Sequence, residues 1–252
     1  MTLGFIGTGT MAAAMVEGLG GGDILLSPRG AEVAADLARR FPGVRIATDN
    51  QAVIDGSDMV VLAVRPQVAE AVIRPLRFRA EQTVVSVIAA TQIGSLRDWI
   101  GLELPIIRAI PLPFAANRAS VTPLYPPDAE VAALFNRLGT ALPCESLAEF
   151  DLLAVGSALM GSYFGLLETA QGWLVAQGLD DRAARTYLAG LFANLGKVAA
   201  ESPAGFATLR AEHSTPGGLN EQIFRDFAAA GGTAALTSAL DRVLDRVRGR
   251  TE

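Results

Sequence analysis

The stretch Leu3-Gly4-Phe5-Ile6-Gly7-Thr8-Gly9-Thr10-Met11-Ala12 decides the fold of this chain. The residues Leu3–Ile6 predict a strand, and Met11–Leu19 predict a helix directly after it. Between them lies the pattern G-x-G-x-x-A, in which the first glycine permits a sharp turn and the second lets a ligand approach the backbone. A small third residue lets the helix pack close to the strand. This context predicts a dinucleotide site, with the pyrophosphate at the positive end of the helix, rather than a purely structural turn.

Strands alternate with short helices through the first half of the chain, as in a parallel, doubly wound sheet with right-handed crossovers. The expected strands are Leu3–Ile6, Asp23–Ser27, Val44–Ala47, Met59–Val64, Thr83–Ile88, Pro105–Ile110, Ser120–Leu124 and Ala141–Cys144. The expected helices between them are Met11–Leu19, Gly30–Phe41, Val68–Pro75, Ile93–Ile100 and Ala129–Gly139.

The pattern changes near Glu145, because no convincing strand follows Leu147. The helices expected there are Glu149–Gln177, Asp180–Glu201, Ala204–Glu212, Leu219–Ala230 and Gly232–Arg248. We therefore expect an α/β protein with two domains, residues 1–146 and 147–252. The first is a Rossmann-type doubly wound parallel sheet, and the second is an all-helical domain.

One helical stretch is uncharged from Leu152 to Leu167, which is shorter than the roughly 20 residues that span a bilayer. We expect it to be buried on all sides, inside the protein or between subunits, and we expect no membrane partner. Glu168 follows it and would be a buried carboxylate that needs a partner. A helical half this apolar predicts a homodimer that forms through the helical domain.

Composition narrows the function further. Half of the 252 residues are hydrophobic and 19% are charged, which supports a substantial core. The net charge is −5 and the only basic run is the short tail Arg246–Arg250, so we expect no nucleic acid partner. We also expect no metal site. Cys144 is the only cysteine, which excludes an internal disulfide and suits a reducing cytoplasm. A nucleophilic role for it is the weaker alternative, because no base pattern lies nearby.

The residues at the end of the second strand indicate whether the cofactor is NAD or NADP. An acidic residue there would bind the ribose 2′-hydroxyl of NAD, but this chain has Ser27-Pro28-Arg29. Serine can donate to a 2′-phosphate and arginine can neutralise it, so we expect NADP(H) to be preferred over NAD(H). The alternative for Arg29 is an ordinary exposed arginine that opens a helix.

The chain resembles the pyrroline-5-carboxylate reductases over nearly its whole length. Gly4–Ala12 is similar to the family's first motif, and Ser86–Ala90 is similar to its strand-five motif. Leu62–Gln67 is similar to the strand-four motif, with arginine in place of the usual lysine. Ser214–Gly218 is similar to the Ser-Pro-Gly-Gly segment that holds the substrate carboxylate. The resemblance implies reduction of a cyclic imino acid to proline, and a helical domain that interlocks with its twin.

The glycine turn, the strand ends and this resemblance together give the expected cofactor-binding residues. They are Gly7, Thr8, Gly9, Thr10, Met11, Ser27, Arg29, Asn50, Ala63, Val64, Arg65, Pro66 and Ala89. Small residues after the expected strands would let the backbone touch the nicotinamide and its ribose, and plain strand-end packing is the alternative. Asn50 stands where the resemblance places an asparagine near the adenosine ribose.

The resemblance also indicates which residues bind the substrate. The residues that would bind substrate are Ser214, Thr215, Gly217, Gly218 and Asn220. The backbone N–H groups of the two glycines, at the start of the next helix, would hold a carboxylate. His213 is the only histidine and would donate a proton to the substrate. Asn220 would add a side-chain hydrogen-bond donor for the substrate. The alternative is that both residues have only structural roles. Glu221 would bind a substrate amine or merely favour the helix N-terminus.

The substrate half departs from the family. Pro111-Leu112-Pro113-Phe114 replaces the family's Pro-Asn-Thr-Pro, and Leu219-Asn220 replaces a threonine pair. We therefore expect an NADPH-dependent reductase that acts on an imine or carbonyl beside a carboxylate, with a small imino or keto acid as substrate. The alternatives are a β-hydroxyacid dehydrogenase, whose catalytic lysine is absent from the long helix, and a nucleotide-binding protein that has lost catalysis.

Overall fold

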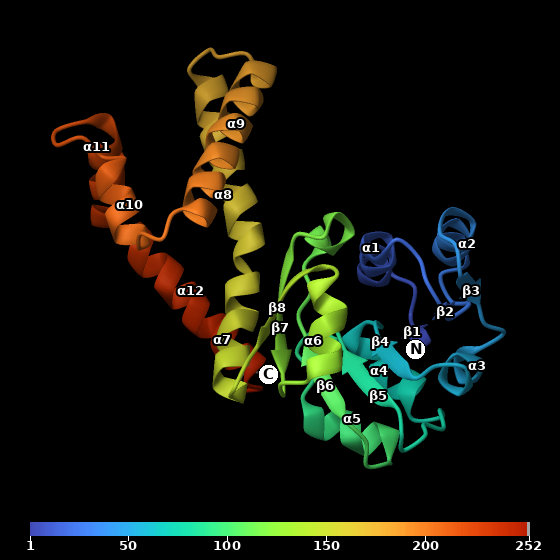
Figure 1. Ribbon diagram of the computed structural model, residues 1–252. Helices are drawn as coiled ribbons and strands as arrows, with labels where there is room; N and C mark the ends of the chain where they lie inside the picture. Colours follow the sequence, from blue (N-terminus) through green and yellow to red (C-terminus); the bar gives the residue numbers. More distant parts are fainter. Residues whose placement is uncertain (251–252) are drawn as a thin grey trace. The chain divides into compact units, whose positions relative to one another are not determined.

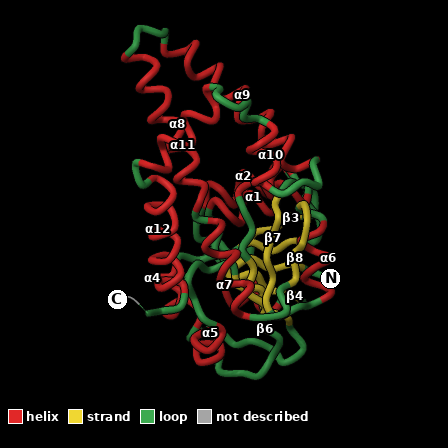
Figure 2. The backbone as a smooth tube through the Cα atoms, turned by 90° about the vertical axis from the view of Figure 1, so that its left-hand side faces the viewer, coloured by secondary structure: helices red, strands yellow, loops and turns green. Residues whose placement is uncertain are grey.

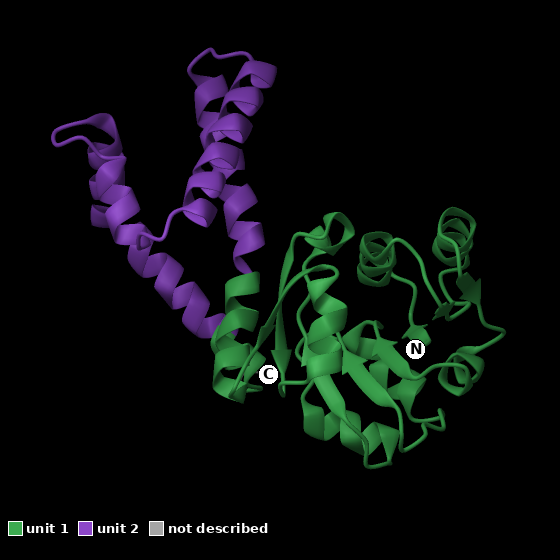
Figure 3. Ribbon diagram, in the orientation of Figure 1, with its two compact units in different colours: residues 1–157, 244–252 green, residues 158–243 purple. Residues whose placement is uncertain are grey.

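A computed structural model describes residues 1–250 (Figure 1). The chain forms two compact units (Figure 3): unit 1 is residues 1–157 together with the chain from Leu244 onward, and unit 2 is residues 158–243. Helix α7 (Leu147–Ser157) belongs to unit 1, although it follows the boundary expected at residue 146. The division of functions at that residue stays a prediction.

Unit 1 is built around one eight-stranded sheet with the order β3-β2-β1-β4-β5-β6-β7-β8. The strands are β1 (Leu3–Ile6), β2 (Ile24–Leu26), β3 (Val44–Ile46), β4 (Met59–Leu62), β5 (Thr83–Ser86), β6 (Ile106–Ala109), β7 (Ser120–Tyr125) and β8 (Gly139–Pro143). Figure 2 shows them in yellow, next to one another. The first six strands have the order of a doubly wound dinucleotide-binding sheet, so the predicted fold class is confirmed.

One strand pair differs from the expected parallel sheet. β7 runs antiparallel to β6, whereas β8 is parallel to β7. The link between Ala109 and Ser120 is shorter than the roughly twelve residues that a parallel crossover needs, and therefore the chain turns back instead.

Helices α1 to α6 connect the strands of unit 1. They are α1 (Thr10–Leu19), α2 (Ala31–Arg40), α3 (Asn50–Asp55), α4 (Pro66–Ile73), α5 (Ile93–Ile100) and α6 (Ala129–Asn136). The sequence patterns missed α3 and the 3₁₀ helix η1 (Pro113–Asn117), because both are too short to show a helical period. Asp49 caps α3, since its Oδ1 accepts a hydrogen bond from Ala52 N at 2.8 Å.

The core of unit 1 lies on both faces of the sheet, because neighbouring residues of a strand point to opposite sides. Phe5 belongs to the cluster that contains Met15 of α1 and Phe135 of α6. Ile6 belongs to the other cluster, which contains Ile54 of α3. These side chains are fully buried, and each contributes about 1.5–3 kcal/mol of hydrophobic stabilisation.

Helix α1 packs against η1 at a glycine. An added Cβ at Gly18 would overlap the backbone oxygen of Ala115 and lie 2.8 Å from Leu138 Cδ2. Arg118 Nε also donates a hydrogen bond to Gly18 O at 2.7 Å, which joins the two segments. The helix therefore needs glycine here for space.

Unit 2 consists of helices and their connections. They are α8 (Leu159–Ala176), α9 (Asp181–Glu201), α10 (Phe206–Glu212), α11 (Leu219–Ala229) and the greater part of α12 (Gly232–Val247). The single helix expected from Glu149 to Gln177 is two helices, α7 and α8, which are interrupted at Ala158. Asp180 caps α9 as the sequence predicted, since its Oδ2 accepts from Ala183 N at 3.0 Å.

The apolar surface of α8 is exposed in the single chain. None of its residues is buried, and Phe164 and Trp173 are 65% and 63% exposed. The prediction that this stretch is buried inside the chain is therefore wrong, while burial between subunits stays a prediction. One stretch of the described residues, Leu147–Ala176, is long and apolar enough to cross a membrane by length and composition alone, a test that core helices of soluble proteins also pass.

We expect Gly18→Ala to lower the free energy of unfolding by about 1–3 kcal/mol, because the new methyl group overlaps backbone atoms. Gly94→Ala is the matched control, since Gly94 of α5 has no heavy atom within 4 Å of an added Cβ. That substitution should raise stability by roughly 0.5–1 kcal/mol through helix propensity. Urea unfolding followed by circular dichroism measures both variants, and an equal loss in the two would contradict the packing argument.

Candidate functional site

A cavity lies at the carboxyl ends of β1, β2 and β4. It has a volume of about 250 Å³ and is lined by Gly7, Thr8, Gly9, Arg29, Gly30, Ala63, Val64, Arg65 and Val68. Strand β1 lies between β2 and β4. The strands β2 and β3 are added toward one edge of the sheet, and the strands from β4 onward are added toward the other edge. Open α/β sheets bind ligands at such a switch point.

The turn after β1 is fixed by its neighbours. Gly7 N donates a hydrogen bond to Ser27 Oγ at 2.9 Å, and Thr8 Oγ1 donates to the carbonyl oxygen of Arg29. Gly7 has φ +98°, and an added Cβ there would lie 2.7 Å from Ala63 O. Glycine is therefore required at this position for both conformation and space.

The start of α1 is open to an anion. Gly9, the residue before the helix, makes no side-chain cap and has no heavy atom within 4 Å of an added Cβ. The first N–H groups of a helix have no partners within the helix and carry partial positive charge. Arg29 and Arg65 line the same cavity, while no described Asp or Glu does. These residues fit the phosphates of a dinucleotide.

Ser27 is not placed as expected. Its side chain has 0% exposure, and its hydroxyl oxygen accepts the hydrogen bond from Gly7 N. The predicted direct contact with a 2′-phosphate does not suit a side chain that is enclosed by the turn. Arg29 is exposed at the cavity, so the predicted choice between NADP and NAD depends on Arg29 alone.

The other predicted cofactor residues lie in the loops and helix starts that follow β1, β3, β4 and β5. Those that line the cavity are Ala63, Val64 and Arg65. Those that lie outside its lining are Thr10, Met11, Asn50, Pro66 and Ala89. Ala89 is exposed in the loop after β5, where the next residue, Ala90, has φ +52°. A positive φ is uncommon for a residue with a side chain, and such residues often occur at functional sites.

The predicted substrate segment joins α10 and α11 in unit 2. A cavity of about 580 Å³ lies beside it and is lined by Arg210, Ala211, Ser214, Pro216, Glu221, Phe224, Arg225 and Ala228. Arg210 stacks on Phe224, with Cζ 4.4 Å from the ring centroid. Of the predicted substrate residues, only Ser214 belongs to this lining.

The glycine amides of the substrate segment already have partners. Gly217 N donates to Glu221 Oε2 at 2.7 Å, and Gly218 N donates to Thr215 O at 2.8 Å. The expectation of two free N–H groups is therefore wrong for this conformation. Glu221 lies in the first turn of α11 and reaches back, so a carboxylate ligand must displace it to bind Gly217 N.

His213 and Asn220 hold the turn between α10 and α11. His213 Nδ1 lies 2.8 Å from Leu209 O, and Asn220 Nδ2 donates to His213 O at 2.8 Å. A carbonyl oxygen only accepts hydrogen bonds, so Nδ1 of His213 carries a proton. The exposed Nε2 then has a proton to give only when the ring is a cation.

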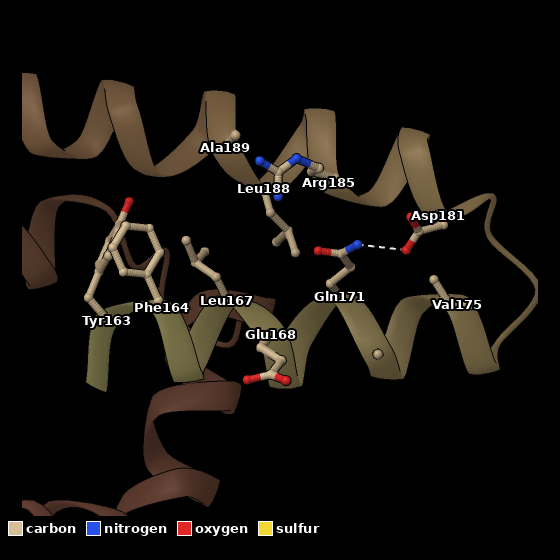
Figure 4. Close-up of a pocket in the computed structure, with 11 residues that line it drawn as sticks. Tyr163, Phe164, Leu167, Glu168, Gln171, Val175, Asp181, Arg185, Leu188 and Ala189 are labelled. Carbon is tan, nitrogen blue, oxygen red and sulfur yellow. Dashed lines mark hydrogen bonds between the residues drawn. The ribbon is translucent and has the colours of Figure 1, made fainter. Parts of the chain in front are cut away.

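A further cavity, of about 670 Å³, lies between α8 and α9 (Figure 4). Gln171 Nε2 donates to Asp181 Oδ1 at 2.6 Å and so links the two helices. Tyr163 meets Phe164 and Phe192 edge to face, with ring centroids 5.1 Å and 5.8 Å away. Glu168 is exposed and turns away from α9 in Figure 4, so it is not buried within the single chain, and its burial between subunits stays a prediction.

The sequence patterns missed a buried charged cluster in unit 1. Arg108 of β6 and Asp151 of α7 are each 4% exposed, and the Arg108 guanidinium lies 4.6 Å from the centroid of Phe150. Arg248 Nε lies 3.9 Å from Asp151 Oδ2. Burial lowers the pKa of Arg108, and the charge of Asp151 opposes this effect. The sequence does carry one sign of this cluster, because Arg108 and Asp151 each interrupt an apolar run.

The lone cysteine is not set up as a nucleophile. Cys144 is 2% exposed, and burial raises the pKa of its thiol. The reactive form of cysteine is the thiolate, which a raised pKa disfavours. Catalysis through Cys144 therefore has no support in the structure.

Two protein families match separate parts of the chain. Residues 2–90 match the family described as NADP oxidoreductase coenzyme F420-dependent, and residues 151–249 match pyrroline-5-carboxylate reductase dimerisation. The pyrroline-5-carboxylate reductase of Pseudomonas aeruginosa is 29% identical over 97% of this chain and 94% of its own length. That of Methanosarcina acetivorans is 28% identical over 97% and 96%. The crystal structure of the Streptococcus pyogenes enzyme superposes with a TM-score of 0.87 at 25% identity, over 99% and 98% of the two chains.

The fold, the cavity at Gly7–Gly9 and these matches define an oxidoreductase that uses a nicotinamide dinucleotide, with a Rossmann-type unit and a helical dimerisation domain. The chain is similar to the pyrroline-5-carboxylate reductases along nearly its whole length, with 29% and 28% identity to two of them. The resemblance seen in the sequence motifs is thereby confirmed.

We expect Gly9→Ala to weaken NADPH binding at least about tenfold and to leave the melting temperature within about 2 °C of the wild type. The added methyl group meets no protein atom, and therefore its effect should fall on the ligand. Titration calorimetry and thermal unfolding measure the two quantities. A variant that binds NADPH normally would show that the cofactor does not approach Gly9.

Proposed function

We propose that the protein reduces the C=N bond of a small cyclic imino acid, next to its carboxylate, with NADPH as the reductant. The observation that carries the proposal is the open, positively charged cavity at Gly7–Gly9. It lies in a chain that aligns over 97% of its length with a pyrroline-5-carboxylate reductase. The resemblance of Ser214–Gly218 to a carboxylate-binding segment supports the choice of substrate.

Bound NADPH would supply the hydride, so the chain needs no nucleophile of its own. Gly9 and the first turn of α1 would bind the pyrophosphate, and Arg65 would add positive charge at the same cavity. Arg29 would pair with the 2′-phosphate. The loop that contains Ala89 would touch the nicotinamide with its backbone and keep its reactive face toward the substrate.

The segment between α10 and α11 would hold the substrate. Gly217 N and the side chain of Asn220 would bind the carboxylate once Glu221 and the carbonyl oxygen of His213 are released as partners. His213 would deliver a proton from Nε2 as the imidazolium. An imine that arrives already protonated needs no such acid, in which case His213 only orders the turn.

The exposed helical surface supports a homodimer. Tyr187 of α9, Phe164 and Trp173 of α8, and Ile223 of α11 are all more than half exposed in one chain. Soluble monomers rarely leave so much apolar surface in water. We propose that a second copy covers this surface, in agreement with the dimerisation family that matches residues 151–249. We also propose that the enzyme acts in the cytoplasm, where its single cysteine would stay reduced.

NADPH oxidation in the presence of 1-pyrroline-5-carboxylate tests the proposed reaction. We expect absorbance at the reduced nicotinamide band to fall with this substrate and not with open-chain keto acids. Turnover of a keto acid alone would favour the β-hydroxyacid dehydrogenase alternative. NADPH binding without turnover of any imino or keto acid would favour a non-catalytic protein.

We expect Arg29→Ala to weaken NADPH binding about 10- to 100-fold, as for the loss of a hydrogen bond to a charged group, and to change NADH binding less than about twofold. Arg39→Ala is the control, because Arg39 is an exposed arginine of α2 that lies outside the cavity lining. Dissociation constants from nicotinamide fluorescence measure the effect. Equal losses for NADPH and NADH would show that Arg29 does not read the 2′-phosphate.

A further inference from the structure

The loop after β5, residues 88–91, has a conformation that its surroundings must maintain. Ala90 has φ +52°, and a residue with a side chain keeps such a backbone only where neighbouring contacts enforce it. Thr91 is buried and donates from Oγ1 to Ala89 O at 3.2 Å. The other hydrogen bond of the loop, from Ile88 N to Ser86 Oγ, measures 3.4 Å. Both bonds are long, so the loop depends on what holds its end.

Gln92 comes directly after the loop, and its side-chain amide is hydrogen-bonded in two directions. Nε2 donates to Val247 O at 3.0 Å, at the end of α12. Oε1 accepts from Arg108 Nη1 of β6 at 3.4 Å, the weaker of the two bonds. Helix α5 begins at the next residue, Ile93, which fixes the backbone on the far side.

Both partners of Gln92 are themselves anchored. Arg108 is buried and stacked on Phe150, so its guanidinium cannot move without losing that contact. Val247 precedes Arg248, whose Nε lies 3.9 Å from Asp151 Oδ2. The side chain of Gln92 therefore connects the loop after β5 to a fixed strand and to the end of a long helix.

We infer that Gln92 is a positioning residue for the nicotinamide half of the cofactor, and that it makes the shape of loop 88–91 depend on the end of α12. The inference rests on the proposed function, in which this loop touches the nicotinamide. Loss of the Gln92 bonds loosens the loop and weakens contact with the nicotinamide. In the proposed function the phosphates bind at Gly9 and Arg29, which line a cavity at other strand ends, so phosphate binding is unaffected.

Two substitutions distinguish the effects of the two hydrogen bonds made by the Gln92 side chain. Gln92→Leu keeps a similar size and removes both. Gln92→Glu keeps an acceptor for Arg108 and removes the donor to Val247 O. Gln82→Leu is the matched control, since Gln82 is a buried glutamine just before the same strand and donates to Ile54 O and Ser57 O at 2.7 Å each.

The experiment compares the dissociation constants of NADPH and of 2′,5′-ADP, which carries the phosphates of the adenosine half but no nicotinamide. For Gln92→Leu we expect the NADPH constant to rise about 3- to 10-fold, and the 2′,5′-ADP constant to stay within about twofold. Gln92→Glu should give a smaller rise in the same direction. Gln82→Leu should lower the melting temperature and leave the ratio of the two constants unchanged.

The inference fails if Gln92→Leu changes both constants by the same factor or changes neither. If that variant does not fold, Gln92→Glu, which retains its shape and one bond, decides the question by the same ratio. A wild-type protein that binds neither NADPH nor 2′,5′-ADP would instead refute the proposed function. The two failures are therefore distinguishable.

Discussion

The left-handed turn at Gly7 is the constraint on which the first unit depends. Its N–H group is bound by Ser27 Oγ, and its missing side chain leaves room for Ala63 O. The ends of β2, β1 and β4 are thereby joined at one point. This junction directs the start of α1 toward the cavity, and the same helix then packs through Gly18 on the segment before β7. A change at the turn would alter both the cavity and the packing behind it.

The sequence predicted most of unit 1, because its signals are local. Apolar runs gave every strand, and the spacing of Gly7, Gly9 and Ala12 gave the cofactor turn. Ser27 shows where such reasoning stops. The residue lies at the predicted strand end, but its hydroxyl faces the protein, and the direction of a side chain at the end of a strand depends on register and on the neighbouring turn.

The buried charged cluster that sequence reasoning missed depends on contacts between distant residues. Arg108 and Asp151 lie in separate apolar segments, and only the folded sheet and α7 bring their charges together. The bond from Gly217 N to Glu221 is local in sequence, yet it was missed because glutamate at a helix start has several possible partners. Exposure of the apolar helices reflects a different limit, since one sequence does not tell whether an apolar face is covered by its own chain or by another.

Unit 2 is an insertion within unit 1. The chain leaves unit 1 after Ser157 and returns at Leu244, so the end of α12 packs with residues that come much earlier in the chain. The hydrogen bond from Gln92 to Val247 O joins residues that are 155 positions apart. Closing so long a loop costs conformational entropy that no local contact offsets, and therefore we expect this part of unit 1 to form late in folding.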